Sequence, residues 1–338
     1  MIFVTGGTGL LGSHLLFELA GKGEKVRALF RTESRKAEVL KTFGYYSNDP
    51  QALFDKIEWV KGDTLDYLSL EQAMKGVSLV YHVAGFVSFA REDREKMMQV
   101  NIQGTANVVN AALETGIDKL CYVSSIAAVG PSANGDPACE EDQWKPAKDN
   151  SAYSISKYYA EMEVWRGIVE GLKAVIVNPS IILGPGNWEK GSSSIFPAVY
   201  KGMKFYSSGV TAYVDVRDVV KSMVLLMNSD ISGQRFIVSA ENTGYKDLFS
   251  MIATNFNKPL PQYKATKFIL QAVWRLDWLR SKLFFGKQFL SKEMARSAVK
   301  KVYVSNLKIK EAMGMDFLPL KQTTRDICRI YMNELSTS

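Results

Sequence analysis

A glycine-rich turn near the start of the chain constrains its fold more than any other feature. Residues 2–5 have the pattern of a buried strand and residues 13–20 that of an amphipathic helix, with three regularly spaced glycines between them. Such glycines let the backbone turn tightly and approach a pyrophosphate, while the helix start offers N–H groups to the phosphates. We therefore predict a strand–turn–helix unit that binds a dinucleotide. The residues expected to contact the dinucleotide are Gly6, Thr8, Gly9, Leu10, Leu11 and Gly12.

Strand-like and helical segments alternate through the first half of the chain. The run at residues 79–84 is almost continuously apolar, as in parallel sheets that helices cover on both faces. The pattern predicts an α/β fold, in which a doubly wound parallel sheet is joined to a smaller, mainly helical carboxyl-terminal lobe. The further strands are expected at residues 25–30, 57–61, 79–84, 119–123, 172–177 and 235–239. We expect residues 1–178 and 213–240 in the sheet domain, and residues 179–212 and 241–338 in the lobe.

A tyrosine and a lysine at residues 153 and 157 form the first candidate for chemistry. They stand four residues apart in a strongly helical run, so both side chains face the same way. A phenol has an ordinary pKa of about 10, and an ammonium one turn away favours the phenolate. Tyr153 and Lys157 are therefore a candidate general acid and base. The same spacing also occurs on solvated helix faces, so a catalytic role for the pair needs support from other motifs.

Several residues at the ends of the predicted strands suit a dinucleotide. Arg31 follows the second strand, where an NAD enzyme usually has an acidic residue, and with Arg35 it can pair with the 2′-phosphate of NADP. The alternative is that both arginines are simply solvated. Asp63, with Thr64 beside it, follows the third strand, where it can accept a hydrogen bond from adenine. The other strand-end residues expected at the site are Ala84, Gly85 and Ser125.

Composition excludes several other classes of site. The net charge of +7 is spread along the chain without long blocks, which suits an anionic cofactor and does not indicate nucleic-acid binding. The three cysteines lie far apart, so we expect neither a disulfide framework nor a metal site. The chain contains two histidines, and we expect His82 to be a hydrogen-bonded core residue. The first residues already have a strand-like pattern, so we expect a cytoplasmic protein without a secretory leader.

The segment at residues 267–285 is rich in aromatic and aliphatic residues. Arg275, Asp277 and Arg280 interrupt it, so it does not resemble a membrane span. Two interpretations remain: it forms the core or cap of the second lobe, or it is an amphipathic element that lies on a membrane. We favour the first, because helices of globular proteins bury such stripes more often.

Taken together in order, these motifs make the chain similar to the extended short-chain dehydrogenase/reductases, the NAD(P)-dependent epimerase/dehydratase superfamily. The resemblance covers almost the whole chain and implies a Rossmann-like sheet with a small substrate lobe. It also implies that Tyr153 is the acid or base, that Ser125 positions the substrate oxygen, and that Lys157 tunes Tyr153 and binds the nicotinamide ribose. Asn101 matches a family asparagine with a structural or proton-relay role, and Pro179 matches the proline beside the nicotinamide.

Within that superfamily the chain most resembles the branch of dihydroflavonol 4-reductase and 3β-hydroxysteroid dehydrogenase relatives. Residues 26–31 resemble the second strand of the NADP-using reductases, and residues 213–219 resemble their later motif. The chain departs from the sugar-nucleotide epimerases at Thr211, where those enzymes usually carry an arginine that binds the substrate diphosphate. Threonine cannot supply that charge, which puts a nucleotide-sugar substrate in doubt.

The leading hypothesis is an NADP-dependent oxidoreductase, with NAD as the other cofactor considered, that reduces a ketone or aldehyde or oxidises the alcohol. Its substrate is expected to be a mainly apolar small molecule, because apolar residues follow Gly85 and recur in the second lobe. Those residues are Phe86, Val87, Phe89, Trp274 and Trp278. The alternatives are an epimerase or dehydratase of a nucleotide sugar and a non-catalytic dinucleotide sensor. We expect a monomer or homodimer.

Overall fold

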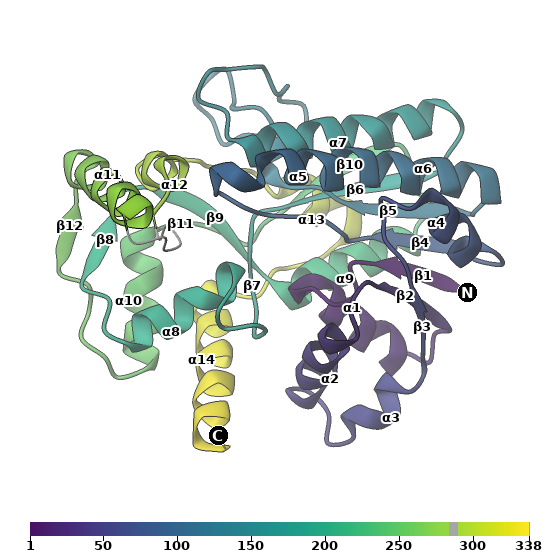
Figure 1. Cartoon of the computed structure of the whole chain (residues 1–338), viewed down its shortest axis with the longest axis horizontal. Coiled ribbons are helices and arrows are strands. Elements are labelled where there is room, and N and C mark those ends of the chain that lie inside the picture. The colour runs from purple at the N-terminus through teal and green to yellow at the C-terminus, as the bar shows by residue number, and fades with distance from the viewer. Residues whose placement is uncertain (284–289, 338) are drawn as a thin grey trace.

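The computed structural model describes residues 1–283 and 290–337, and a parallel sheet of seven strands lies at its centre (Figure 1). The strand order is β10-β6-β5-β4-β1-β2-β3, and every neighbouring pair is parallel. Strand β1 starts in the middle of the sheet, so the chain runs outward to one edge, returns past β1 and continues to the other. This doubly wound, Rossmann-like topology confirms the predicted fold class. The strands are β1 (Ile2–Thr5), β2 (Val26–Phe30), β3 (Ile57–Lys61), β4 (Leu79–His82), β5 (Lys119–Val123), β6 (Ala174–Pro179) and β10 (Gln234–Val238).

Helices cover both faces of this sheet, and side-chain alternation along the strands explains why. In β1, Ile2 and Val4 point into one apolar core and Phe3 points into the other. Helices α1 and α9 pack in the first core, and α4, α6 and α7 pack in the second, on opposite sides of the sheet in Figure 1. The helices of this part are α1 (Leu10–Gly21), α2 (Lys36–Gly44), α3 (Pro50–Phe54), α4 (Tyr67–Met74), α5 (Arg94–Met98), α6 (Gly104–Thr115), α7 (Ala152–Val169) and α9 (Val216–Met227).

The helical segment that follows β4 is interrupted. A short π-helical segment, η3 (Gln99–Gln103), lies between α5 and α6 and contains Asn101. Such π segments add a residue to one turn and often occur at functional sites. The remaining short turns are 3-10 helices at η1 (Glu33–Arg35), η2 (Arg91–Asp93), η4 (Ile126–Ala128) and η5 (Gly191–Ser194).

The rest of the chain forms two small sheets with their own helices. One sheet has the order β11-β9-β7 and the other pairs β12 with β8. Tyr213 and its neighbours lie in β9, so the chain rejoins the first core with the following helix α9. A third apolar cluster lies among β7, β9, α8, α10 and α14. The bounds are β7 (Ile181–Leu183), α8 (Ile195–Tyr200), β8 (Phe205–Ser207), β9 (Val210–Asp215), β11 (Glu241–Gly244), α10 (Tyr245–Asn255), β12 (Tyr263–Ala265), α11 (Lys267–Leu283), α12 (Lys292–Ser297), α13 (Leu307–Met313) and α14 (Leu320–Thr337).

The apolar helix α11 corrects one expectation. We favoured a place for residues 267–285 in the core or cap of the second lobe, yet none of the residues of α11 is buried. The helix lies on the outside next to α12, as Figure 1 shows. The described part of the segment is therefore not part of a core, while its place as a cap of the second lobe stays a prediction. Phe284 and Phe285 lie outside the described residues. Among the described residues, none of the helices has the length and apolar character that a membrane crossing needs.

Candidate active site

The glycine turn between β1 and α1 has the geometry that a pyrophosphate site needs. Gly6 has a φ of +70°, and a Cβ there would lie 2.5 Å from the backbone nitrogen of Ala84. A Cβ on Gly12 would lie 2.1 Å from the Gly6 carbonyl oxygen, so both positions require glycine. Gly9 caps α1 without a side-chain hydrogen bond to the first-turn N–H groups. Those N–H groups are suited to an anion, so the turn fits a dinucleotide pyrophosphate.

The two arginines expected at the adenosine end both pair with carboxylates. Arg31 Nη1 lies 3.6 Å from Asp63 Oδ2 at the ends of β2 and β3, and Arg35 Nη1 lies 2.9 Å from Glu38 Oε2. The Arg31 side chain is 60% exposed. An exposed ion pair of this kind contributes at most about 1 kcal/mol, so Arg31 can exchange Asp63 for a phosphate at small cost. Thr64 beside Asp63 is buried.

Ser125 and Tyr153 come together at the carboxyl end of β5. Ser151 caps α7 by accepting a hydrogen bond of 3.0 Å from the Ser154 N–H, which places Tyr153 in the first turn. Burial raises the pKa of Tyr153, and the nearby Ser125 hydroxyl acts in the opposite direction. The phenol is therefore protonated at neutral pH and lies near the Ser125 hydroxyl.

Lys157 lies one turn further along α7 and is buried. Its Nζ donates to the carbonyl oxygen of Val123 at 2.8 Å and to the phenol oxygen of Tyr122 at 3.0 Å. Burial lowers the pKa of Lys157 to about 8, while the carboxylate of Glu161 raises it. We expected this ammonium to tune Tyr153, and both hydrogen bonds that its Nζ donates in the structure go to β5. Lys157 is thus held by β5.

Asn101 holds the backbone that follows β4. Its Oδ1 accepts from the Phe86 N–H at 2.7 Å, and its Nδ2 donates to the Phe86 carbonyl at 3.0 Å and to Ser156 Oγ at 2.9 Å. A Cβ on Gly85 would lie 3.6 Å from Asn101 Oδ1 and 3.9 Å from Lys157 Nζ. These contacts favour the structural role for Asn101, because its amide joins the Gly85–Phe86 backbone to α7.

Sequence reasoning missed a polar network beneath these residues. Asn178 Nδ2 donates to the Ser125 carbonyl oxygen at 3.1 Å and to Glu161 Oε2 at 2.7 Å. Arg235 Nη1 donates to Glu161 Oε1 at 3.0 Å, and its other nitrogens donate to the carbonyls of Glu140 and Asp142. Glu161 lies four residues after Lys157, which is one further helical turn. This spacing alone would have predicted that Glu161 lies on the same face of the helix as Tyr153 and Lys157. Pro179 is buried in β6 directly after Asn178.

One of the apolar residues expected at the site lies against Tyr153. The rings of Phe89 and Tyr153 lie edge to face with centroids 6.4 Å apart. Phe89 and Val87 are 38% and 59% exposed, so they are not core residues. The Trp274 indole donates to Gln271 on its own helix at 2.8 Å, and Trp278 is half exposed on α11.

His82 and Thr211 are both buried, and neither supplies a charged group to the site. His82 is buried between Thr5 Oγ1 at 2.7 Å and Thr105 Oγ1 at 3.0 Å, and burial lowers its pKa to about 3. It is therefore a hydrogen-bonded core residue, as expected. Among the described residues, no group of histidine, cysteine and acidic side chains could hold a metal ion. Thr211 is buried in β9 opposite Thr243 of β11, and it carries no charge for a diphosphate.

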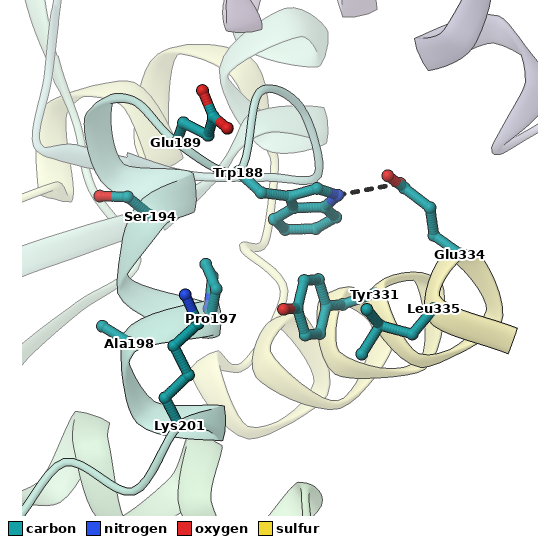
Figure 2. Close-up of a pocket in the computed structure, with 9 residues that line it drawn as sticks. All are labelled: Trp188, Glu189, Ser194, Pro197, Ala198, Lys201, Tyr331, Glu334 and Leu335. Atoms are coloured by element: carbon teal, nitrogen blue, oxygen red, sulfur yellow. Dashed lines mark hydrogen bonds between the residues drawn. The ribbon is translucent and has the colours of Figure 1, made fainter. Parts of the chain in front are cut away.

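A cavity of about 480 Å³ lies between α8 and α14 and contains none of the expected site residues (Figure 2). Trp188 and Tyr331 form part of its lining, and the Trp188 indole donates to Glu334 at 2.9 Å. Glu334 also accepts from Tyr45 at 2.8 Å and pairs with Lys41, both on or next to α2. The cavity therefore borders a set of polar contacts that connect α14 to the sheet domain.

Known proteins resemble this chain over nearly its whole length. The NAD dependent epimerase/dehydratase family matches residues 2–239. A Synechocystis protein named as a dihydroflavonol 4-reductase is 29% identical, over 98% of this chain and 94% of that protein. Sterol demethylase protein B of Methylococcus capsulatus is 29% identical, over 84% of this chain and 83% of that protein. The structure of Thermotoga maritima UDP-glucose 4-epimerase, 20% identical, matches with a TM-score of 0.78 over 99% of both chains, which shows the common fold alone.

The family match spans the first sheet, the glycine turn and the Tyr153 helix, which are the parts that carry the resemblance seen in the sequence. The reductase-named relative extends the likeness through the second part of the chain. The chain therefore belongs to the NAD dependent epimerase/dehydratase family, and it is an NAD(P)-dependent oxidoreductase of the extended short-chain dehydrogenase/reductase type.

Proposed function

We propose that this protein uses NADPH to reduce the carbonyl group of a mainly apolar small molecule, or catalyses the reverse oxidation. The observation that carries the proposal is that the buried, protonated Tyr153 phenol lies near Ser125, at the carboxyl end of β5. A protonated phenol is the form that a general acid needs. Carboxyl ends of parallel strands are where open α/β sheets bind their ligands.

Each group of the site has one task in this reaction. NADPH, when bound at the glycine turn and Lys157, would supply the hydride that the carbonyl carbon accepts. Tyr153 donates its proton to the carbonyl oxygen, and Ser125 donates a hydrogen bond that positions this oxygen and stabilises the charge that develops on it. Lys157 binds the nicotinamide ribose, because two of its three N–H groups are taken by β5 and one is left for a cofactor hydroxyl. Hydride and proton together convert the carbonyl to an alcohol.

The preference for NADPH rests on Arg31, with Arg35 as a second cation. Arg31 exchanges its exposed partner Asp63 for the 2′-phosphate, and Asp63 is then free to accept from the adenine amino group. A charge-assisted pair with phosphate is stronger than the exposed pair that it replaces. With NADH this exchange would gain nothing, since a 2′-hydroxyl carries no charge.

An apolar substrate is supported by the surroundings of Tyr153. Phe89 lies against its ring, Val87 is exposed nearby in sequence, and Thr211 offers no cation for a diphosphate. A diphosphate without a cationic partner in such a site would lose several kcal/mol of solvation. Two relatives are named for a dihydroflavonol and a sterol, and neither compound carries a diphosphate. Other relatives are named for cinnamoyl-CoA, whose coenzyme A part does carry one.

Calorimetry with the NADP-saturated protein tests the substrate class. We expect heat from binding of apolar ketones and alcohols, and none from UDP-glucose or GDP-mannose. Tight binding of a nucleotide sugar with no response to apolar ketones would instead support the epimerase or dehydratase alternative.

A further inference from the structure

The apolar face of α11 points away from the protein. Phe268, Ala272, Leu276, Leu279 and Leu283 follow one another at spacings of three or four residues, so they form one stripe along the helix. Phe268, Leu276 and Leu283 are 82%, 67% and 64% exposed. A contiguous exposed stripe of this kind marks an interaction surface, whereas single exposed apolar residues do not.

The opposite face of α11, which packs on the protein, is more polar than the stripe. Its half-buried residues are Leu270, Gln271, Trp274, Asp277, Arg280 and Ser281, so polar side chains outnumber apolar ones there. Asp277 accepts from Arg280 at 2.8 Å and from the Leu290 N–H at 2.9 Å. A helix that serves only to complete a globular core has the reverse orientation, with the apolar stripe inside. The sequence of α11 therefore suits a second apolar environment outside the protein.

The charges beside the stripe identify that environment. Lys267, Arg275 and Lys282 are exposed on α11, and the neighbouring helix α12 adds exposed Lys292 and Arg296. The acid of α11, Asp277, is turned toward the protein and bound there. An apolar stripe flanked by lysine and arginine is the composition of helices that lie in the interface of an anionic bilayer.

We propose that α11 docks this protein on the surface of a bilayer that contains anionic lipids. The helix lies flat, with the stripe at Phe268 and Leu276 among the acyl chains and the cations against the head groups. A second copy of the chain is a poorer partner for the same face, because pairing two α11 helices would bring their cationic flanks together.

Docking would bring the catalytic part of α7 close to the lipid. Glu293 Oε1 of α12 accepts from the Ala152 N–H at 3.5 Å, and Ala152 directly precedes Tyr153. An apolar substrate dissolved in the bilayer would then have a short path to the site. This consequence rests on the proposed function, whereas the docking itself does not.

Sedimentation with vesicles tests the docking without any turnover assay. We expect the protein to sediment with vesicles of phosphatidylcholine and phosphatidylserine, more weakly with phosphatidylcholine alone, and less as salt is added. Leu276→Glu places a charge in the stripe and should weaken binding at least about tenfold. The matched control is Leu68→Glu on α4, since Leu68 is 65% exposed and lies outside the stripe; its binding should be unchanged.

Three results would overturn the proposal. One is no sedimentation with either vesicle, and another is equal binding by wild type and Leu276→Glu. The third is a dimer in analytical ultracentrifugation that Leu276→Glu converts to a monomer, which would make a second copy the partner. Circular dichroism melts confirm that both variants fold, and NADPH titration is run separately. A protein that binds vesicles but not NADPH would retain the docking proposal and lose the proposed function.

Discussion

Lys157 donates a hydrogen bond of 3.0 Å to the phenol oxygen of Tyr122, so the buried ammonium is anchored to a side chain of β5. We predict that Tyr122→Phe, which removes this acceptor and keeps the ring, weakens NADPH binding about tenfold. A hydrogen bond to a charged group contributes about 1.5–3 kcal/mol, and part of it is recovered through Val123. Tryptophan fluorescence titration measures the affinity. An unchanged affinity would show that this anchor does not matter for the cofactor.

Tyr153→Phe should retain NADPH binding and lower turnover by at least about a hundredfold, the usual scale for loss of a general acid. The control is Tyr159→Phe, since Tyr159 lies on the same helix and is 47% exposed. Steady-state kinetics of both variants give the comparison. If the two variants lose the same amount of activity, Tyr153 is not the acid.

Glu161 raises the pKa of Lys157, which burial lowers to about 8. Lys157 is charged below that pKa, so NADPH affinity should fall as pH rises through about 8. Glu161→Gln removes the carboxylate, so the pKa of Lys157 falls further and the loss of affinity begins at lower pH. The control is Glu163→Gln, which breaks a half-buried pair with Arg166 on the same helix. Identical pH profiles for Glu161→Gln and wild type would contradict the coupling.

Arg31→Ala should lower the affinity for NADPH and leave that for NADH unchanged. A desolvated pair with the 2′-phosphate corresponds to about ten- to a hundredfold in affinity. Because the Arg31 side chain is 60% exposed, we expect the lower end of that range. Lys22→Ala, which breaks a comparable exposed pair with Glu18, is the control. Equal binding of both cofactors by the unmodified protein would end the claim.

The fold could be predicted because its signals are local. The bounds predicted for β5, residues 119–123, are those of the structure. The glycines at residues 6 and 12 predict the tight turn after β1, where a Cβ would clash with the backbone. The interruption at Asn101 could not be foreseen, because a π segment has the same helix-forming composition as its flanks.

The site was predictable only as far as sequence spacing reaches. The helical spacing placed Tyr153 and Lys157 on one helix, but the partners of Lys157 come from a strand 34 residues earlier. The link from Asn178 to Ser125 and Glu161 is likewise tertiary. The exposure of α11 could not be predicted from its sequence. An apolar stripe indicates that a helix has an apolar partner, but it does not identify that partner.

The most direct test of the account is a hydride-transfer assay with the wild-type protein and Tyr153→Phe. Each is mixed with NADPH and a panel of apolar ketones and aldehydes, and the absorbance of the reduced nicotinamide is followed. We expect absorbance loss matched by alcohol formation for wild type, and a rate at least about a hundredfold lower for Tyr153→Phe. No absorbance loss with any carbonyl compound, together with conversion of a nucleotide sugar by the same preparation, would contradict it.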